Sequence, residues 1–452
     1  MSGVRLTASP GPPLAGSFTP PGDKSITHRA CLLALLAPGI SEIRGPNPGD
    51  DCASTVRCAQ ELGLEVLADP AGDPKSGTLR LRGRGGPLDE PRRILDCGNS
   101  GTTLRLLAGI VATQPFLSVL AGDASLHRRP VGRVVEPLRR MGATVCARDG
   151  DRCPPLVVRG ARLQAIRYAV PVASAQVATC VLLAGLSAEG ETSVELPGPA
   201  RDHTERMMAA AGIPIRRDEL AAGGRRVTVR GPASPQPLSL TVPGDFSAAA
   251  FFLAAAAATP GARVTATGVN LNPTRTGLLD VLARMGAAVK VEGARTEAGE
   301  ERGDVTVVGP AHLAAFEIPP DWVPRLIDEV PAWAVAASAA QGRSRLAGAA
   351  ELRLKESDRL AVLAANLARL GIRANELLDG IEIEGGGVRG GTVDAAGDHR
   401  IAMAFAVLGT RAQSAVTIED ASSIATSYPG FVADLGRLGG VVEPAGAGIA
   451  PR

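Results

Sequence analysis

One pattern of apolar and polar positions recurs along the chain: a stretch with helical spacing, then a glycine, then a short run of β-forming residues. A glycine ends a helix readily because it adopts the left-handed conformation without the steric cost of a Cβ atom. The six copies, spaced by 68–85 residues, predict six small αβ modules in two groups of three, with helix-ending glycines at Gly63, Gly142, Gly212, Gly286, Gly371 and Gly439. Chance recurrence of a common helix ending is the alternative.

A second repeat divides the six modules into halves. PGDKS at residues 21–25 and PGDFS at residues 243–247 lie 222 residues apart, and each precedes an apolar helical run. The aspartate or the serine of each motif can cap its helix, because short oxygen-bearing side chains accept the unpaired N–H groups of a first turn. We therefore predict two similar α/β domains, one of residues 21–242 and one of residues 1–20 plus 243–452.

The composition is that of a globular protein. The 452 residues are 45% hydrophobic and 21% charged, enough for a sizeable core. The longest apolar run, residues 248–258, is too short to span a membrane, and the first residues do not resemble a signal peptide. Seven cysteines, an odd number without a C-x-x-C spacing, argue against a disulfide framework, so we expect the protein to reside in a reducing cytoplasm. Five scattered histidines argue against a zinc site.

The charge distribution argues against one class of partner and singles out one residue. The net charge is only +2, the basic residues are dispersed and aromatic residues make up 3% of the chain, so nucleic acid is not an expected partner. Only four of the 48 basic residues are lysines. Because an ammonium group differs from a guanidinium in size and in the ease with which its pKa shifts, we expect Lys24 to have a specific role.

Two motifs with small residues precede apolar helices. In PGDKSITHRA, Lys24, Ser25 and Arg29 stand at a helix start, where backbone N–H groups and cations favour an anion. In LDCGNSGTTLR, Gly98 and Gly101 allow a ligand to approach the backbone. The ordinary alternatives are a capped helix with two surface cations and a tight turn.

Further clusters combine cations with hydroxyl, amide or acidic groups, most of them at a predicted helix start: Arg128, Arg129 and Arg133; Ser174 and Gln176; Arg201 and Asp202; Asp328 and Glu329; Lys355, Glu356, Asp358 and Arg359; Asp398, His399 and Arg400. Taken singly, Asp328 is equally well explained as a helix cap, and the last two clusters as solvated helix ends with charge pairs three or four residues apart. Together the clusters predict a site for a substrate with several anionic groups.

The motifs resemble, in the same order, those of the 5-enolpyruvylshikimate-3-phosphate synthases: PGDKSITHRA, LDCGNSGTTLR, LHRRP, SAQ, RDHTE, PGDFSAAAFFLAAA, IDEVP, LRLKESDR, GDHRIAM and SYPGF. The resemblance implies two similar domains, each of three βαβαββ units (an inverse αβ barrel), with the active site in the interdomain cleft. The implied reaction moves the enolpyruvyl group of phosphoenolpyruvate to the 5-hydroxyl of shikimate 3-phosphate, in aromatic amino-acid biosynthesis. No metal or organic cofactor is expected, and the enzyme is expected to be a cytoplasmic monomer and a target of glyphosate.

The resemblance also implies roles for individual residues. Lys24, Asp328 and Glu356 are the expected catalytic residues, and the two carboxylates are expected to transfer protons. Shikimate 3-phosphate is expected to contact Lys24, Ser25, Arg29, Ser174, Ala175, Gln176, Arg201, Asp328 and Lys355. Phosphoenolpyruvate is expected to contact Lys24, Gly101, Arg129, Gln176, Arg359 and Arg400. Asn99 and Arg105 are expected to shape the loop that holds Gly101.

Some positions depart from the family's commonest pattern. Ala175 removes a hydroxyl, Glu351 replaces an asparagine, His203 replaces an isoleucine, and the lysine that often precedes the last motif is absent from ATSYPGF. These departures put individual contacts and the response to inhibitors in question.

Two other functions stay open at this stage. The sister enolpyruvyl transferase acts on UDP-N-acetylglucosamine, but it typically has a cysteine ahead of its Arg-Pro, which residues 122–130 lack. An anion-binding protein without turnover would need neither Asp328 nor Glu356.

Overall fold

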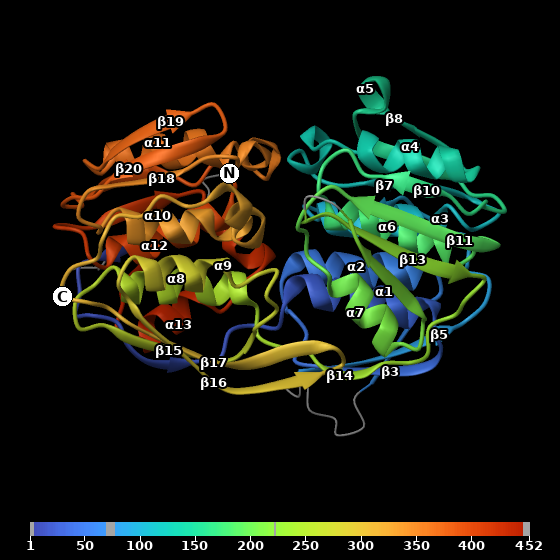
Figure 1. The fold of residues 1–452 in the computed structure, drawn as a ribbon, viewed down its shortest axis with the longest axis horizontal. Coiled ribbons are helices and arrows are strands. Elements are labelled where there is room, and N and C mark those ends of the chain that lie inside the picture. Colours follow the sequence, from blue (N-terminus) through green and yellow to red (C-terminus); the bar gives the residue numbers. More distant parts are fainter. Residues whose placement is uncertain (1–3, 69–76, 221–222, 446–452) are drawn as a thin grey trace, which may run out of the picture. The chain divides into compact units, whose positions relative to one another are not determined.

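The computed structural model describes residues 4–68, 77–220 and 223–445. These residues fold as two compact units (Figure 1). Each unit has a hydrophobic core of its own. The N-terminal unit contains Gly22–Pro243 and, in addition, the hairpin tip Thr296–Glu300. The C-terminal unit contains the residues up to Pro21, Gly244–Arg295 and the residues from Glu301 onwards.

The described residues of the N-terminal unit form three modules. One comprises β6 (Leu95–Asp96), α3 (Gly101–Val111), β7 (Leu117–Ala121), α4 (Gly132–Met141), β8 (Thr144–Ala147) and β9 (Cys153–Arg159), with the short helix α5 (Arg148–Asp151) before β9. The next comprises β10 (Arg167–Ala169), α6 (Ala175–Gly185), β11 (Gly190–Leu196), α7 (His203–Ala210), β12 (Ile215–Glu219) and β13 (Arg225–Gly231). The third comprises α1 (Lys24–Leu36), β3 (Pro38–Arg44), α2 (Asp50–Glu61), β4 (Glu65–Leu67) and β5 (Thr78–Arg84), with β14 (Ser239–Thr241) as its first strand.

The sheets of these modules share one strand order. The first and second strands of a module pair in parallel, and the fourth strand pairs antiparallel with both the second and the third, as in β6-β7-β9-β8, β10-β11-β13-β12 and β14-β3-β5-β4. A parallel pair needs a crossover, and α3 supplies it between β6 and β7, as α6 does between β10 and β11. In the third module β14 comes from the far end of the segment, so its pairing with β3 closes the unit. The predicted βαβαββ unit is therefore confirmed.

The C-terminal unit repeats this architecture in its described residues. Its first module comprises β2 (Ala15–Phe18), α8 (Phe246–Ala257), β15 (Arg263–Asn270), α9 (Gly277–Arg284), β16 (Ala288–Glu297) and β17 (Glu300–Val308). The second comprises α10 (Val330–Ala337), β18 (Arg343–Leu346), α11 (Arg359–Arg369), β19 (Arg373–Leu377) and β20 (Gly380–Glu384). The third comprises β21 (Gly391–Asp394), α12 (His399–Gly409), β22 (Val416–Glu419), α13 (Phe431–Arg437) and β23 (Val441–Ala445), with β1 (Arg5–Ser9) as its fourth strand.

One of these sheets differs from the repeating pattern. The module of α10 has the three-stranded sheet β18-β20-β19, and single parallel bridges at Ala314 and Glu317 take the place of a first strand. The sequence explains the difference, because Pro319 and Pro320 follow at once and a proline has no N–H group to donate to a sheet.

Buried helices form the centre of each unit. In the N-terminal unit α3 packs against α1 and α6, and in the C-terminal unit α8, α10 and α12 pack against one another (Figure 1). All residues of α8 are buried, which explains why its sequence FSAAAFFLAAAA is apolar on every face. The sheets therefore cover a helical core in each unit, as expected for an inverse αβ barrel.

The glycines and caps that the sequence predicted occupy their expected places. The six helix-ending glycines each lie just after a helix, with φ between +80° and +112°. In both repeated PGD motifs it is the aspartate that caps the helix: Asp23 Oδ1 accepts from Ile26 N at 3.0 Å, and Asp245 Oδ1 accepts from Ser247 N at 2.8 Å.

Candidate functional site

The predicted site residues fall into two groups, one in each unit. We call the group in the N-terminal unit the Lys24 site; it contains Lys24, Ser25, Arg29, Gly101, Arg129, Ser174, Ala175, Gln176 and Arg201. We call the group in the C-terminal unit the Arg359 site; it contains Asp328, Lys355, Glu356, Arg359 and Arg400.

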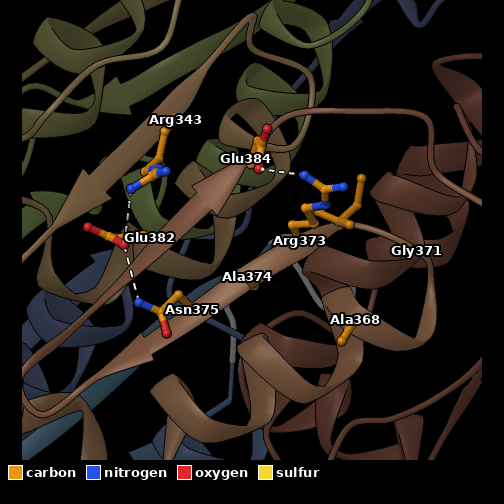
Figure 2. Close-up of a pocket in the computed structure, with 9 residues that line it drawn as sticks. Arg343, Ala368, Gly371, Arg373, Ala374, Asn375, Glu382 and Glu384 are labelled. Atoms are coloured by element: carbon orange, nitrogen blue, oxygen red, sulfur yellow. Dashed lines mark hydrogen bonds and ion pairs between the residues drawn. The ribbon is translucent and has the colours of Figure 1, made fainter.

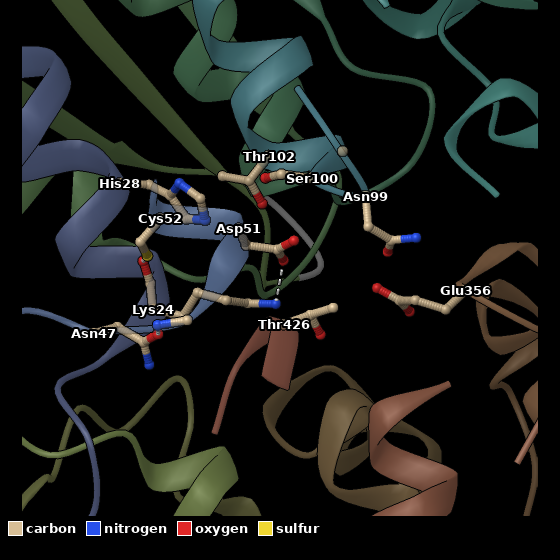
Figure 3. Close-up of polar contacts among 12 residues, drawn as sticks. Lys24, His28, Asn47, Asp51, Cys52, Asn99, Ser100, Thr102, Glu356 and Thr426 are labelled. Carbon is tan, nitrogen blue, oxygen red and sulfur yellow. Dashed lines mark hydrogen bonds and ion pairs between the residues drawn. The ribbon is translucent and has the colours of Figure 1, made fainter. Parts of the chain in front are cut away.

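The ammonium group of Lys24 is paired with a carboxylate that sequence reasoning missed. Lys24 is the first residue of α1, and its Nζ lies 2.8 Å from Asp51 Oδ2, with side chains that are 15% and 9% exposed (Figure 3). Asp51 follows Asp50 in the first turn of α2. Acidic residues at a helix start are ordinarily explained by the positive end of the helix dipole, so the sequence alone does not single out Asp51 as the partner of Lys24.

Arg29 is buried, and its guanidinium ties α1 to its neighbours. Nε donates to Thr204 Oγ1 (2.7 Å), Nη1 to Ser25 O (2.9 Å) and Nη2 to Thr179 Oγ1 (3.1 Å). Burial lowers the pKa of Arg29 to about 10, so the group is still a cation at neutral pH. A guanidinium has five N–H groups, and the predicted contact with a substrate would use those that are left.

Asn99 and Arg105 hold the loop before α3. Asn99 Nδ2 donates to Asp123 Oδ2 at 2.7 Å, and Asn99 Oδ1 accepts from Arg129 Nη2 at 2.7 Å. Arg105 Nη2 donates to Pro130 O at 2.9 Å. The loop that carries Gly101 is therefore fastened to the segment that carries Arg129.

Gly101 leaves room for two guanidinium groups. Ser100 caps α3 by accepting from Thr103 N at 3.0 Å, so Gly101 is the first residue of the helix. A Cβ atom on Gly101 would lie 2.8 Å from Arg105 Nη1 and 3.4 Å from Arg129 Nη1. Close packing against these side chains, and not a special backbone angle, makes this position suited to glycine.

Ser174, Ala175 and Gln176 form the start of α6. Ser174 Oγ accepts from Val177 N at 3.5 Å. Gln176 Oε1 accepts from Arg105 Nη1 at 2.7 Å, and Gln176 Nε2 donates to Thr102 Oγ1 at 2.9 Å. The Gln176 amide thus links the first turns of α3 and α6.

Charged groups cluster around Arg201 at the start of α7. Arg225 Nη2 donates to Arg201 O at 3.1 Å and lies 2.9 Å from Glu205 Oε1. His203 Nδ1 lies 2.7 Å from Glu300 Oε1, a residue of the hairpin tip. The histidine that departs from the family pattern therefore has a carboxylate partner in this chain.

A chain of hydrogen bonds connects α1 with the start of α3. His28 Nδ1 lies 2.6 Å from Thr55 Oγ1, which in turn lies 2.6 Å from Thr103 Oγ1. Burial, together with the charges of Lys24 and Arg29, lowers the pKa of His28 well below its usual value of 6.5. The His28 ring is therefore neutral at pH 7.

Replacing His28 by asparagine is expected to make the free energy of unfolding less dependent on pH. The folded protein disfavours protonated His28 while the unfolded chain accepts the proton, so this stabilisation is present above about pH 6.5 and is lost as the pH falls below it. Urea unfolding at pH 7 and pH 5 should show a smaller loss of stability in His28→Asn than in the wild type. The exposed His312 gives a matched control, because His312→Asn should keep the wild-type dependence. Equal losses in His28→Asn and the wild type would contradict the prediction.

Arg359 is the centre of the second group. It is only 1% exposed; its Nε lies 2.8 Å from Asp398 Oδ2, its Nη2 2.5 Å from Glu356 Oε2 and its Nη1 3.4 Å from Asp328 Oδ1. Burial acts to lower the pKa of Arg359, but the three carboxylates outweigh it and raise this pKa above its usual value. One permanently charged guanidinium therefore holds both carboxylates that are predicted to transfer protons.

Two further cations surround Asp328. Lys355 Nζ lies 3.5 Å from Asp328 Oδ1. Arg400 Nη1 donates to Asp328 O at 2.8 Å, and Nη2 lies 4.0 Å from Asp328 Oδ2. Asp398 caps α12 by accepting from Arg400 N at 2.9 Å, so it holds the Arg359 guanidinium and fixes the start of the helix that carries Arg400.

The ordinary explanations fail for three residues of these motifs: Asp328, Arg359 and Asp398. Asp328 does not cap α10, because the cap position belongs to Glu329, whose side chain makes no capping hydrogen bond. Arg359 and Asp398 are not at solvated helix ends, because both are buried. Lys355 and Asp358 fit that explanation in part, because both are partly exposed and ion-paired. Lys355 Nζ lies 3.6 Å from Oε1 of Glu351, the residue that replaces the family's asparagine, and Asp358 Oδ2 lies 2.8 Å from Arg353 Nη1.

A surface hollow of about 520 Å³ lies on the β18-β20-β19 sheet of the C-terminal unit (Figure 2). Arg373 lies 3.5 Å from Glu384, and Glu382 accepts from Asn375 at 3.2 Å. These charges are matched within the hollow, and the described residues that line it include none of the predicted site residues. Among the described residues we find neither a helix long and apolar enough to cross a membrane nor a cluster of side chains suited to a metal ion.

Comparison with known proteins shows which family has these motifs. A family model for EPSP synthase (3-phosphoshikimate 1-carboxyvinyltransferase) matches residues 8–435. The chain belongs to the EPSP synthase family. Among its relatives, the 3-phosphoshikimate 1-carboxyvinyltransferase of Anaeromyxobacter sp. (strain Fw109-5) is 50% identical, with 94% of this chain and 96% of the relative covered. That of Acidithiobacillus ferrooxidans is 47% identical, with 98% and 100% covered.

Solved structures agree with this assignment to the EPSP synthase family. The EPSP synthase of Acinetobacter baumannii is 40% identical with a TM-score of 0.85, and 98% of this chain and 100% of that one are covered. The enolpyruvyl transferase NikO of Streptomyces tendae has a TM-score of 0.77, with 98% and 99% covered, but at 18% identity it supports the fold alone. The resemblance and the fold class that the sequence predicted are confirmed.

Proposed function

We propose that this member of the EPSP synthase family transfers the enolpyruvyl group of phosphoenolpyruvate to the 5-hydroxyl of shikimate 3-phosphate, giving 5-enolpyruvylshikimate 3-phosphate and phosphate. The observation that carries the proposal is the binding of Asp328 and Glu356 to the one guanidinium of Arg359. Carboxylates repel anionic ligands. A protein that only bound anions would therefore bind them less tightly if two carboxylates lay among its cations. They are useful when the reaction moves protons.

The reaction needs an acid and a base in each of two steps. In the addition, the 5-hydroxyl oxygen bonds to C2 of phosphoenolpyruvate, the hydroxyl loses its proton and the vinyl methylene gains one. In the elimination, the methyl group returns a proton, the double bond reforms and the C–O bond to phosphate breaks. Asp328 and Glu356 are the proposed proton-transfer groups, because the guanidinium of Arg359 binds both carboxylates and thereby holds them near each other.

The cations of both sites are proposed to bind the substrate anions and to stabilise the charge that develops as phosphate leaves. Arg129, Arg359 and Arg400 are the proposed ligands of phosphoenolpyruvate. Ser25, Ser174 and Arg201 are proposed to contact shikimate 3-phosphate, and Lys24 to contact both substrates.

The proposal is tested by the release of phosphate from phosphoenolpyruvate. Release that depends on shikimate 3-phosphate supports it. Release with UDP-N-acetylglucosamine instead would assign the chain to the sister transferase. Binding of both anions without any release would leave a binding protein. We further propose a cytoplasmic location, in keeping with seven cysteines that form no disulfide. We also propose a monomer, and sedimentation tests this oligomeric state.

Gly101→Ala is expected to raise the inhibition constant of glyphosate more than the KM for phosphoenolpyruvate. Glyphosate is the longer of the two molecules, and the added Cβ, 2.8 Å from Arg105 Nη1, forces either this guanidinium or the ligand to move. Overpacking of this kind costs about 1–3 kcal/mol, roughly a ten- to hundredfold change in affinity. Competitive inhibition assays measure both constants.

A matched control for this substitution is Gly436→Ala, since a Cβ at that helical glycine meets no atom within 4 Å. It should leave both constants unchanged. Equal shifts of the two constants in Gly101→Ala would show that this position does not discriminate by ligand length.

A further inference from the structure

A buried arginine outside the predicted site contacts the start of α8. Arg275 lies in the segment between β15 and α9 and is 1% exposed. Its Nη2 donates to Ser247 Oγ at 2.7 Å and lies 3.2 Å from Asp245 Oδ1. Removing a guanidinium from water is costly unless charged and polar partners receive it, so a cation kept at this place needs an explanation.

Ser247 also binds a second buried carboxylate, that of Glu329. The Ser247 hydroxyl accepts from Arg275 and donates to Glu329 Oε1. The side chain of Glu329 is fully buried. A cation and a carboxylate are therefore joined through one hydroxyl, which fixes the position of the carboxylate.

Glu329 is the neighbour of Asp328 in the chain, and it competes with Asp328 for the same arginine. Arg400 Nη1 donates to Asp328 O at 2.8 Å and lies 4.0 Å from Glu329 Oε1. At such distances in a buried site, charges interact strongly because water screens them little. A Glu329 carboxylate that was no longer bound through Ser247 would attract Arg400 away from Asp328.

We propose that Arg275 is a positioning residue of the transferase reaction: through Ser247 it holds the Glu329 carboxylate, so that Arg400 stays on Asp328. This inference rests on the proposed function. It assigns Arg275, Ser247 and Glu329 no contact with a substrate. Their effect is on where Asp328 and Arg400 stand and on the net charge beside Asp328.

The central experiment compares Arg275→Met with the double variant Arg275→Met/Glu329→Gln. Misplacement of a catalytic group is expected to lower kcat about tenfold or more in the single variant. An uncompensated carboxylate beside Asp328 also favours its protonated form, so the acid limb of the kcat–pH profile should move to higher pH. Removing the charge of Glu329 should restore kcat to within about threefold and return the acid limb to its place.

Two further variants separate this role from a loss of packing. Arg275→Lys keeps the charge and should retain more of kcat than Arg275→Met. Arg411→Met is the control, because Arg411 is a partly buried arginine of the same unit, where it contacts Ser338 Oγ at 3.3 Å. Its kcat and pH profile should be those of the wild type. If Arg275→Met does not fold, Ser247→Ala replaces it, with an expected loss of kcat and the same shift of the acid limb.

The outcomes are distinct. A wild-type protein that releases no phosphate would overturn the proposed function. With an active wild type, a folded Arg275→Met (or, in its place, Ser247→Ala) with unchanged kcat and pH profile would overturn the role of Arg275. So would a double variant that stays as impaired as the single one.

Discussion

Lys24→Arg is expected to lose nearly all turnover, on the order of 10²–10³-fold in kcat, while the fold is retained. The Lys24 ammonium lies 2.8 Å from Asp51 in a place that is mostly shielded from water. An arginine would present a wider, planar group that binds the Asp51 carboxylate through two N–H groups and is thereby drawn away from the substrates. Steady-state assays of phosphate release measure the effect.

Lys290→Arg is the matched control for this variant. Lys290 is an exposed lysine that lies 2.7 Å from Glu292, so the same exchange of groups there should change neither kcat nor KM. Turnover at the wild-type level in Lys24→Arg would show that any cation suffices at this position, contrary to the argument from the scarcity of lysines.

Glu356→Gln is expected to lower kcat on the order of 10²-fold or more, the usual contribution of a positioned acid or base. In the wild type, Arg359 Nη2 lies 2.5 Å from Glu356 Oε2. The amide of the variant keeps the shape of the side chain, and its oxygen can still accept from this N–H group. KM values should therefore change less than kcat. The complete time course, with phosphate measured directly, separates the two constants.

Glu376→Gln supplies the comparison, because Glu376 also binds an arginine, with its Oε1 2.7 Å from Arg353 Nη1, but lies outside the predicted site. Its kcat should be unaffected. If Glu356→Gln kept kcat and raised only KM, Glu356 would be a binding residue and the base or acid would have to be sought elsewhere.

Local signals account for the part of the fold that the sequence predicts. A helix end marked by Gly142 or Gly371, and a helix start marked by Asp23 or Asp245, depend on a few neighbouring residues, so they can be recognised without the tertiary structure. The missing strand at Ala314 has a local signal in Pro319 and Pro320, but the number of residues that pair before these prolines depends on the tertiary structure.

For the candidate site, too, the sequence is informative only about local features. The motifs single out Lys24, Glu356 and Arg359 as candidates, but they do not show that Asp51 binds Lys24 or that Asp398 binds Arg359. These partners are distant in the sequence, and an aspartate at a helix start has an ordinary local explanation that conceals a tertiary ion pair. Arg275 escapes notice in the sequence for a similar reason, because its partners Ser247 and Asp245 are also distant along the chain.

The placement of β1 has a consequence for how the protein is made. Thr7 of β1 faces Thr417 of β22, 410 residues further along the chain. On the ribosome, the strands of Gly22–Pro243 are all available once β14 has emerged, whereas β1 has no partner until β22 follows. At about 5–20 residues per second, β1 waits at least about 20 seconds. A nascent unpaired strand invites aggregation, and this one is short, carries Arg5 and is followed at once by Pro10, features that discourage wrong pairing.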